Sequence, residues 1–249
     1  MRVDCARAHL EIEGVLAALA GARCQLLPFQ ALASRPDLLI ESGLAESTWR
    51  ELVGAPGLGG RFHLQDSLLK CDIPDDVWSA ESVLRLAWLI STVRQGGLLM
   101  HGCAVGWEGR GVAAIGISTA GKSTLAALCG GAPGNAAILT DEIVQLFPDG
   151  TCFGTPFRSN VENVGQPGPV KLKSLLLLTK GPHEAVSPVP ASEALAELLP
   201  QLFWFNTGEG SLGEQKRRLL ALVDTVGVHR LTFRKDAAVG PFLRDWVAQ

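Results

Sequence analysis

The sequence contains no tyrosine, few charged residues and no long hydrophobic run. Charged residues make up 19% of the 249 residues, and the net charge is −3. The chain therefore lacks the basic stripe with which a nucleic-acid-binding protein neutralises phosphates. We assign the short basic run at Lys216–Arg218 to the solvated face of a helix. No nucleic-acid partner is expected.

Signals for a membrane, for secretion and for zinc are also missing. No apolar stretch approaches the roughly 18 residues that a membrane-spanning helix needs. The N-terminus, Met1–Asp4, lacks the apolar core of a signal peptide. The six cysteines are far apart and form no C-x-x-C pair, which argues against a zinc site and favours reduced, buried thiols. The sequence thus predicts a cytoplasmic protein with no membrane partner.

What is present is enough apolar sequence, 47%, for one large core or for a core with a small appendage. The first part of the chain differs in character from the rest. We predict a small N-terminal α+β region over residues 1–78 and a larger domain over residues 79–249. In the first region we expect a helix over Glu11–Leu19, a loop over Gly54–Gly60 and a strand over Arg61–Leu64.

Hydrophobic periodicity in the larger domain alternates between helical and strand spacing. Helices are predicted over 79–97 with Ser79 as cap, from 124 onward, from a Ser192 cap, and over 214–223. Strands are predicted over 98–105, 112–115, 136–140, 143–147, 172–178 and 228–233. The glycine-rich turn at 106–111 predicts a hairpin, so the fold class is α/β with a mixed sheet. A polar loop over 154–169 is long enough to be functional.

The most informative segment is Gly116–Thr124, which fits the pattern G-x-x-x-x-G-K-[ST] at every fixed position. Glycines let several backbone N–H groups point at one phosphate, while the lysine reaches the outer phosphates and the serine hydroxyl binds Mg²⁺. An apolar strand before the loop and a helix after it provide the required context. The alternative is a glycine-rich turn with no ligand. The predicted nucleotide-binding residues are Gly116, Ser118, Thr119, Ala120, Gly121, Lys122, Ser123 and Thr124.

An acidic pair, Asp141 and Glu142, follows the next apolar strand. In a β-α-β unit the strand ends and the helix N-terminus lie at one edge of the sheet, where ligands collect. Neighbouring residues on an extended chain point to opposite faces, so one carboxylate can face a metal and the other an acceptor. The alternative is an acidic pair that solvates a strand end. We predict that Ser123, Asp141 and Glu142 hold Mg²⁺.

Other candidates carry weaker signals. A histidine in an apolar strand, such as His101, is by itself typical of a core residue. Cationic side chains can bind phosphate, but they serve equally well in surface salt bridges. The further candidates are Arg158, Lys171 and Lys173 for phosphate or substrate and Glu162 for the metal, while Cys103 and Cys129 are interpreted as small buried hydrophobes.

Two stretches together resemble the catalytic core of the HPr kinase/phosphorylase superfamily, which shares its nucleotide-binding core with the phosphoenolpyruvate carboxykinases. They are GGLLMHGCAVGWEGRGVAAIGISTAGKSTLAAL (96–128) and ILTDEIVQL (138–146). The shared order is a histidine on a strand, a hairpin, the phosphate loop and an acidic pair. The later FGTPFR, LKSLLLL and ALAELLPQLF segments look like short HPr-kinase-like proteins, some of which occur with peptide-modification pathways. The resemblance implies an HPr-kinase-like core over residues 79–249.

The resemblance also implies roles for individual residues. Lys122 would contact the β- and γ-phosphates of ATP, and Ser123 would ligate Mg²⁺. Asp141 would take the proton from the attacking hydroxyl, with His101 supporting the phosphate nearby. Glu142 stands where the family often has a second aspartate, and its longer side chain alters the geometry. Neither the loop with which bacterial HPr enzymes run their phosphorylase reaction nor their extra N-terminal domain has a counterpart here.

These expectations combine into an ATP- and Mg²⁺-dependent kinase that phosphorylates a hydroxyl, with a serine of a peptide or protein as the acceptor. Its expected catalytic residues are Asp141, His101 and Lys122. Two alternatives stay open, namely a small-molecule kinase with the same site and a nucleotide-binding regulator without catalysis. The donor (ATP, GTP or pyrophosphate) and the formation of a homo-oligomer also stay open.

Overall fold

The computed structural model describes most of the chain as a mixed α/β protein with two mixed sheets and, within the described part, five α-helices. The described residues are 1–5, 8–12, 24, 37–42, 50–51, 60–131, 136–157, 165–204 and 210–249. The chain divides into two compact units. The first is Met1–Gln95, and the second comprises Gly96–Asn206 and Gly210–Gln249. Each unit has its own sheet.

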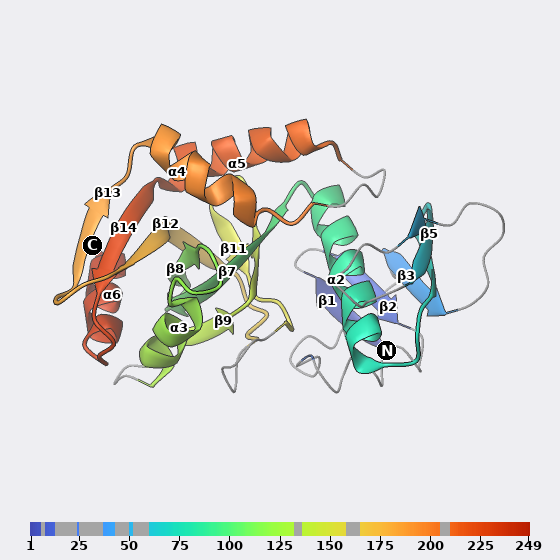
Figure 1. Ribbon diagram of the computed structural model, residues 1–249, viewed down its shortest axis with the longest axis horizontal. Coiled ribbons are helices and arrows are strands. Elements are labelled where there is room, and N and C mark those ends of the chain that lie inside the picture. Colours follow the sequence, from blue (N-terminus) through green and yellow to red (C-terminus); the bar gives the residue numbers. More distant parts are fainter. Residues whose placement is uncertain are drawn as a thin grey trace. The chain divides into compact units, whose positions relative to one another are not determined.

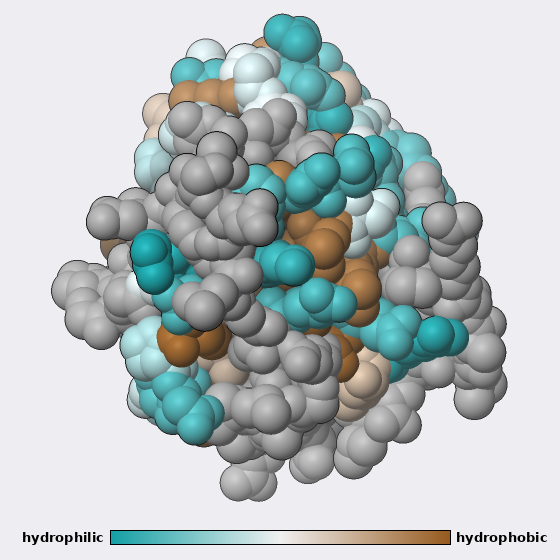
Figure 2. Space-filling view, turned by 90° about the vertical axis from the view of Figure 1, so that its right-hand side faces the viewer, coloured by the Kyte–Doolittle hydropathy of each residue, from teal (hydrophilic) through white to brown (hydrophobic). Residues whose placement is uncertain are grey.

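The N-terminal unit contains a six-stranded sheet in the order β1-β2-β3-β6-β5-β4. The β2–β3 and β3–β6 pairs are parallel and the others antiparallel. Figure 2 shows one face of the molecule on which described apolar side chains of this unit are bordered by polar ones. The strands are β1 (Arg2–Cys5), β2 (Ala8–Ile12), β3 (Leu38–Ser42), β4 (Arg50–Glu51), β5 (Arg61–Gln65) and β6 (Leu68–Asp72).

Helix α2 (Val77–Arg94) confirms the predicted helix but not its cap. The carboxylate of Asp76 accepts hydrogen bonds from the backbone N–H groups of Trp78 and Ser79, at 2.9 and 3.0 Å. Asp76 is therefore the N-cap, and the assignment of Ser79 was wrong. Ser79 lies inside the first turn and donates its hydroxyl to the other oxygen of Asp76.

The end of α2 also fixes where the first unit ends. The Gln95 amide donates to the backbone carbonyl of Cys5 on β1 (3.1 Å), and the Cys5 sulfur lies 3.9 Å from the hydroxyl of Thr92. These contacts attach the helix to the N-terminal sheet. The boundary in the structure thus follows Gln95, whereas the sequence prediction placed it after residue 78.

Predictions for the N-terminal region met mixed outcomes. The strand over Arg61–Leu64 is confirmed as β5. The helix predicted over Glu11–Leu19 begins wrongly, because Glu11 and Ile12 pair with β1 and β3 as part of β2. Its remaining residues, and all but the last residue of the loop at Gly54–Gly60, lie outside the described part of the chain.

The C-terminal unit is built on an eight-stranded mixed sheet in the order β11-β10-β7-β8-β12-β14-β13, with β9 also on β7 (Figure 1). β11 pairs with both β10 and β12, so that β11, β10, β7, β8 and β12 form a closed ring. The strands are β7 (Leu98–Trp107), β8 (Arg110–Ile115), β9 (Ala137–Thr140), β10 (Ile143–Leu146), β11 (Thr151–Phe153), β12 (Val170–Lys180), β13 (Ala185–Pro188) and β14 (Val228–Phe233).

All six strands predicted for this unit are confirmed, as β7, β8, β9, β10, β12 and β14, and β7–β8 is the expected hairpin. The sequence analysis missed the short strands β11 and β13 and the C-terminal helix α6 (Val239–Ala248). Helix α4 (Ala191–Leu198) forms where expected, but Pro190 occupies its N-cap position. Ser192 lies inside the first turn, so its assignment as cap was wrong. Helices α3 (Lys122–Gly130) and α5 (Leu212–Val226) are confirmed.

Helices cover both faces of the C-terminal sheet (Figure 1). On one face, Cys103 and Val105 of β7 pack in a cluster with Leu125 of α3 and with residues of α6. On the other face, Met100 of β7 packs in a cluster with Leu219 of α5 and with residues of α4. Alternate side chains of one strand therefore enter two different cores, as the two-residue period of a strand requires.

Adjacent leucines on α5 test this packing. Leu219 is fully buried in the α4/α5 cluster, whereas Leu220 is 43% exposed. We expect Leu219→Ala to lower the free energy of unfolding by about 2–5 kcal/mol, because it leaves a cavity in the core. Leu220→Ala, the matched control, should change it by less than about 0.5 kcal/mol. Urea unfolding followed by circular dichroism measures both, and equal effects would contradict the assigned helix face.

Candidate functional site

The glycine-rich segment connects β8 to α3 as a tight loop. β8 ends at Ile115, and α3 begins at Lys122. The residue at the N-cap, Gly121, has φ +102° and ψ 15°, a left-handed conformation that glycine adopts without strain. It offers no side chain to cap the helix, so the first-turn N–H groups of α3 have no side-chain acceptor at this position. The structure thus contains the strand, glycine loop and helix that the sequence pattern predicts.

Lys122 is folded back over this loop. Its ammonium group donates to the backbone carbonyls of Gly116 and Ile117, both at 2.7 Å, and only 4% of the residue is exposed. Burial lowers the pKa of Lys122, and the nearby carboxylate of Glu142 opposes that shift. The lysine therefore closes the loop on itself and lies within electrostatic range of one member of the acidic pair.

Strand β7 brings the other candidates to the same edge of the sheet. Both β8 and β9 run antiparallel to β7, so they are parallel to each other and end at the same edge. Gly102 of β7 lies opposite Ile115, the last residue of β8. The preceding residue, His101, lies opposite Ile143, the first residue of β10. His101 is thus placed between the start of the glycine loop and the acidic pair.

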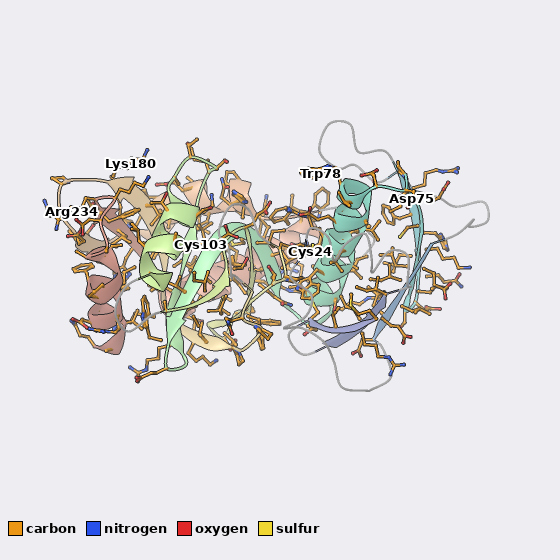
Figure 3. All side chains as sticks on the ribbon, turned by 90° about the horizontal axis from the view of Figure 1, so that it is seen from below. Cys24, Asp75, Trp78, Cys103, Lys180 and Arg234 are labelled. Carbon is orange, nitrogen blue, oxygen red and sulfur yellow. The ribbon has the colours of Figure 1, made fainter. Side chains whose placement is uncertain are left out.

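The face on which His101 lies follows from the alternation along β7. Side chains two residues apart share a face of a strand. Cys103 packs in the cluster that contains α3, and Figure 3 shows it beside that helix. Half-buried His101 is therefore on the α3 face of the sheet, the face on which the glycine loop leads into the helix.

The acidic pair occupies a bend between β9 and β10 rather than an extended strand. Asp141 is 1% exposed and Glu142 is half-buried, so the two carboxylates do have different surroundings. The backbone N–H of Gly102 donates to the carbonyl of Glu142 at 3.0 Å, which fixes the bend against β7 beside His101.

Cys103 lies in the core on the α3 face, within electrostatic range of Lys122 and Asp141. Burial raises the pKa of its thiol to about 12, the nearby charge of Asp141 acts in the same direction, and the charge of Lys122 acts against it. Asp141 and Lys122 are thus both close enough to affect one thiol. The pKa of Cys129 is raised to about 12 for the same reason, burial, which agrees with the interpretation of both cysteines as buried hydrophobes.

The donor set fits magnesium better than a softer metal. Within the described ranges, no group of three or more His, Cys, Asp or Glu side chains is arranged to hold a metal ion. Mg²⁺ with a nucleotide needs less, since one or two carboxylates, a hydroxyl, phosphate oxygens and water complete its shell. Asp141, Glu142 and Ser123 offer oxygen donors of that kind.

The remaining cationic candidates do not join this group. In the β8–β12 register, Lys171 lies opposite Arg110 at the start of β8, the end away from the glycine loop. Its ammonium donates to the hydroxyl of Thr151 at 2.7 Å. The ammonium of Lys173 lies 5.8 Å from the ring centre of Trp246 on α6. The structure thus gives both lysines partners away from the glycine loop, including an ion pair of Lys171 with Asp149 at 3.4 Å, and a role at the phosphate stays a prediction. Arg158 and Glu162 lie outside the described residues.

Two threonines at the site were missed. Thr140, directly before the acidic pair, and Thr155, from the FGTPFR segment, are fully buried and hydrogen-bonded to each other at 3.2 Å. A hydroxyl residue immediately before a carboxylate pair was a usable signal, because such side chains often hold tight bends of the backbone.

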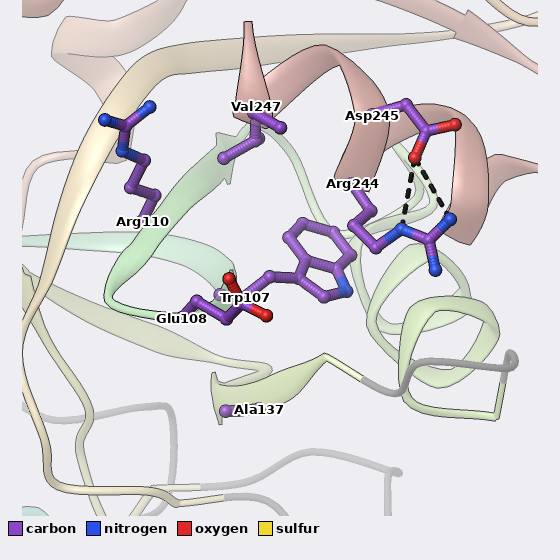
Figure 4. Close-up of a pocket in the computed structure, with 9 residues that line it drawn as sticks. Trp107, Glu108, Arg110, Ala137, Arg244, Asp245 and Val247 are labelled. Carbon is purple, nitrogen blue, oxygen red and sulfur yellow. Dashed lines mark hydrogen bonds and ion pairs between the residues drawn. The ribbon is translucent and has the colours of Figure 1, made fainter.

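A separate hollow of about 880 Å³ lies at the opposite end of the sheet (Figure 4). It is lined by the β7–β8 hairpin, including Trp107, and by α6, where Arg244 is paired with Asp245 at 3.0 Å. Ala137, also in its lining, begins β9, whereas the acidic pair follows the end of that strand. The hollow is therefore distinct from the candidate site.

No protein-family model matches the sequence, and no curated protein is significantly similar to it. Of the helices in the described part of the chain, none has the length and hydropathy needed to cross a membrane.

Two glycines with similar backbone conformations test the loop. Gly121 (φ +102°) lies in the glycine loop and Gly109 (φ +81°) in the β7–β8 hairpin. Replacing either by alanine should cost about 1–2 kcal/mol of stability through the same left-handed strain. Only Gly121→Ala should weaken binding of ATP or pyrophosphate, by about 10-fold or more, equal to about 1.4 kcal/mol. Isothermal titration calorimetry measures both variants, and an equal loss in Gly109→Ala would argue against a phosphate site in the loop.

Proposed function

We propose that the C-terminal unit transfers the γ-phosphate of ATP to a hydroxyl group in a Mg²⁺-dependent reaction, with a serine of a peptide or protein as the acceptor. The observation that carries this proposal is the meeting of three features at one edge of the sheet. They are the glycine loop with Lys122, the bend with Asp141 and Glu142, and His101 between them. A kinase of the HPr-kinase-like type, to which the sequence has a resemblance, requires these three features.

The donor phosphates are assigned to the glycine loop. Gly121 supplies no side-chain cap to α3, and the first turn of this helix carries the positive end of the helix dipole. Lys122 already donates to two loop carbonyls at 2.7 Å, so its ammonium is held at the loop before a ligand arrives. Phosphate oxygens in this position would receive hydrogen bonds from both sources, which suits the β- and γ-phosphates.

The acceptor hydroxyl is assigned to the acidic bend. Asp141 would take the proton from the attacking hydroxyl as the bond to phosphorus forms, and His101, on the same sheet edge, would support the transferred phosphoryl group. Phosphoryl transfer depends mainly on positioning and on charge neutralisation, so these residues suffice without a covalent intermediate. Burial of Asp141 at 1% exposure strengthens its electrostatic interactions by excluding water.

Ser123 and Glu142 are the proposed magnesium ligands, together with Asp141. Mg²⁺, when bound, neutralises phosphate charge and orients the phosphates. Glu142 lies within electrostatic range of Lys122. Glu142 and Lys122 thus link the acidic bend, on the acceptor side of the proposed site, with the glycine loop on the donor side.

Removing the loop lysine tests the donor side. Lys122→Ala should lower the rate of γ-phosphate transfer by about 100- to 1,000-fold, because it removes a charge that stabilises the transferred group. ATP binding should weaken as well. The measurement uses radiolabelled ATP with a panel of serine peptides and small hydroxyl compounds, and exposed Lys216→Ala on α5 is the control. Full activity of Lys122→Ala would contradict the assignment.

Replacing the proposed base tests the acceptor side. Asp141→Asn should keep ATP binding but lower turnover by about 100- to 10,000-fold, because the amide accepts no proton from the hydroxyl. Exposed Asp224→Asn on α5 serves as the control. Normal turnover by Asp141→Asn would refute the base assignment. ATP binding by the wild-type protein without product across the acceptor panel would instead favour a nucleotide-binding regulator, and product only on small compounds would favour a small-molecule kinase.

A further inference from the structure

We infer that Thr140 and Thr155 are positioning residues, which hold the acidic bend in the geometry that the proposed phosphoryl transfer needs. This inference rests on the proposed function for its catalytic consequence, while the geometry that supports it is independent of any ligand. Both threonines are 0% exposed, and their hydroxyl groups are hydrogen-bonded to other groups of the protein.

Thr140 holds the bend from inside. Its hydroxyl oxygen accepts from the backbone N–H groups of Glu142 and Ile143, both at 3.3 Å. These two groups lie at the bend, where β9 has ended and β10 begins. A threonine hydroxyl that accepts hydrogen bonds from the N–H groups two and three residues ahead is a local arrangement that tightens such a bend. The Thr140 hydroxyl itself donates to the carbonyl of Phe157 at 3.3 Å.

Thr155 holds the same bend from a different part of the chain. Its hydroxyl lies 2.7 Å from the carbonyl of Ile143 and 3.2 Å from the hydroxyl of Thr140. A hydroxyl has one proton, so the shorter contact with Ile143 is the principal bond. With Glu142 fixed to Gly102 by a backbone bond at 3.0 Å, the bend is held on both sides. Every one of these contacts involves a residue within two positions of Asp141 or Glu142.

Thr155 also attaches the following segment to the site. Phe157 is fully buried, and Gly154 is tightly packed because an added Cβ would lie 2.0 Å from the carbonyl oxygen of Gln166. Farther along, the N–H of Gly165 donates to the carbonyl of Ile138 on β9 at 3.1 Å. The chain thus contacts β9 on both sides of residues 158–164, through Thr140 before them and through Ile138 after them.

Valine variants remove the hydroxyl groups while keeping the branched shape. We expect Thr140→Val and Thr155→Val each to lower kcat by about 10- to 100-fold, the usual cost of losing a residue that orients a catalytic or metal-binding carboxylate. The dissociation constant for ATP should change by less than about 3-fold, because the glycine loop is untouched. Thr140→Ser and Thr155→Ser keep the hydroxyl and should restore kcat to within about 3-fold of the wild-type value.

The control is Thr151→Val on β11. Thr151 is another buried threonine, and its hydroxyl accepts from Lys171 rather than from the bend. Its removal should leave kcat unchanged. Equal losses of kcat, ATP affinity and melting temperature in the valine variants, without rescue by serine, would show a general structural role and overturn the inference.

Amide hydrogen exchange separates this inference from the proposed function. In Thr140→Val and Thr155→Val, the peptide that covers residues 140–146 should exchange at least about 10-fold faster than in the wild-type protein, while residues 122–130 of α3 stay unchanged. If the wild-type protein transfers no phosphate to any acceptor, the proposed function fails, but this measurement still decides whether the threonines hold the bend. Unchanged exchange over residues 140–146 would overturn the inference even for an active kinase.

Discussion

The pairing of β7 along both of its edges is the interaction on which the rest of the C-terminal unit depends. One edge pairs with β8, whose end leads into the glycine loop, and the other pairs with β9 and β10, which are separated by the acidic bend. The loop and the bend are distant in sequence and have no need to meet unless β7 lies between them. His101 is on that strand, so the same hydrogen bonds that build the sheet also place it between the two.

Charged groups at this edge are buried at a cost that their partners must offset. An unpaired buried ammonium or carboxylate is strongly unfavourable, because it loses its hydration. Lys122 recovers hydrogen bonds from two loop carbonyls, and Glu142 adds an opposite charge within range. A core designed only for stability would place apolar side chains here. Retaining buried charges beside a glycine loop is what a site for a charged ligand requires, since the ligand then meets groups that are already desolvated and oriented.

The sequence was most informative where the physics is local. A strand of apolar residues, a glycine hairpin and the loop pattern correctly predicted β7, β8, α3 and β9, because each depends on residues close together in the chain. It failed where competing partners decide the outcome. Asp76 outcompetes Ser79 as the α2 cap, and Glu11 pairs in a sheet rather than starting a helix. Thr155 was missed at the site because its contact with Ile143 spans 12 positions, and only the folded chain reveals it.

The register of β7 is therefore under a stricter constraint than its hydrophobic pattern alone imposes. A slip of one residue would move His101 to the opposite face of the sheet and away from α3. A slip would also put a residue with a Cβ in the place of Gly102. A Cβ at this position would lie 2.6 Å from a side-chain carbon of Ile115 and 2.8 Å from the carbonyl oxygen of Ala114. Only glycine lets β7 and β8 approach so closely at the residue beside His101. The close packing that fixes the strand and the placement of the candidate catalytic groups are thus one and the same requirement.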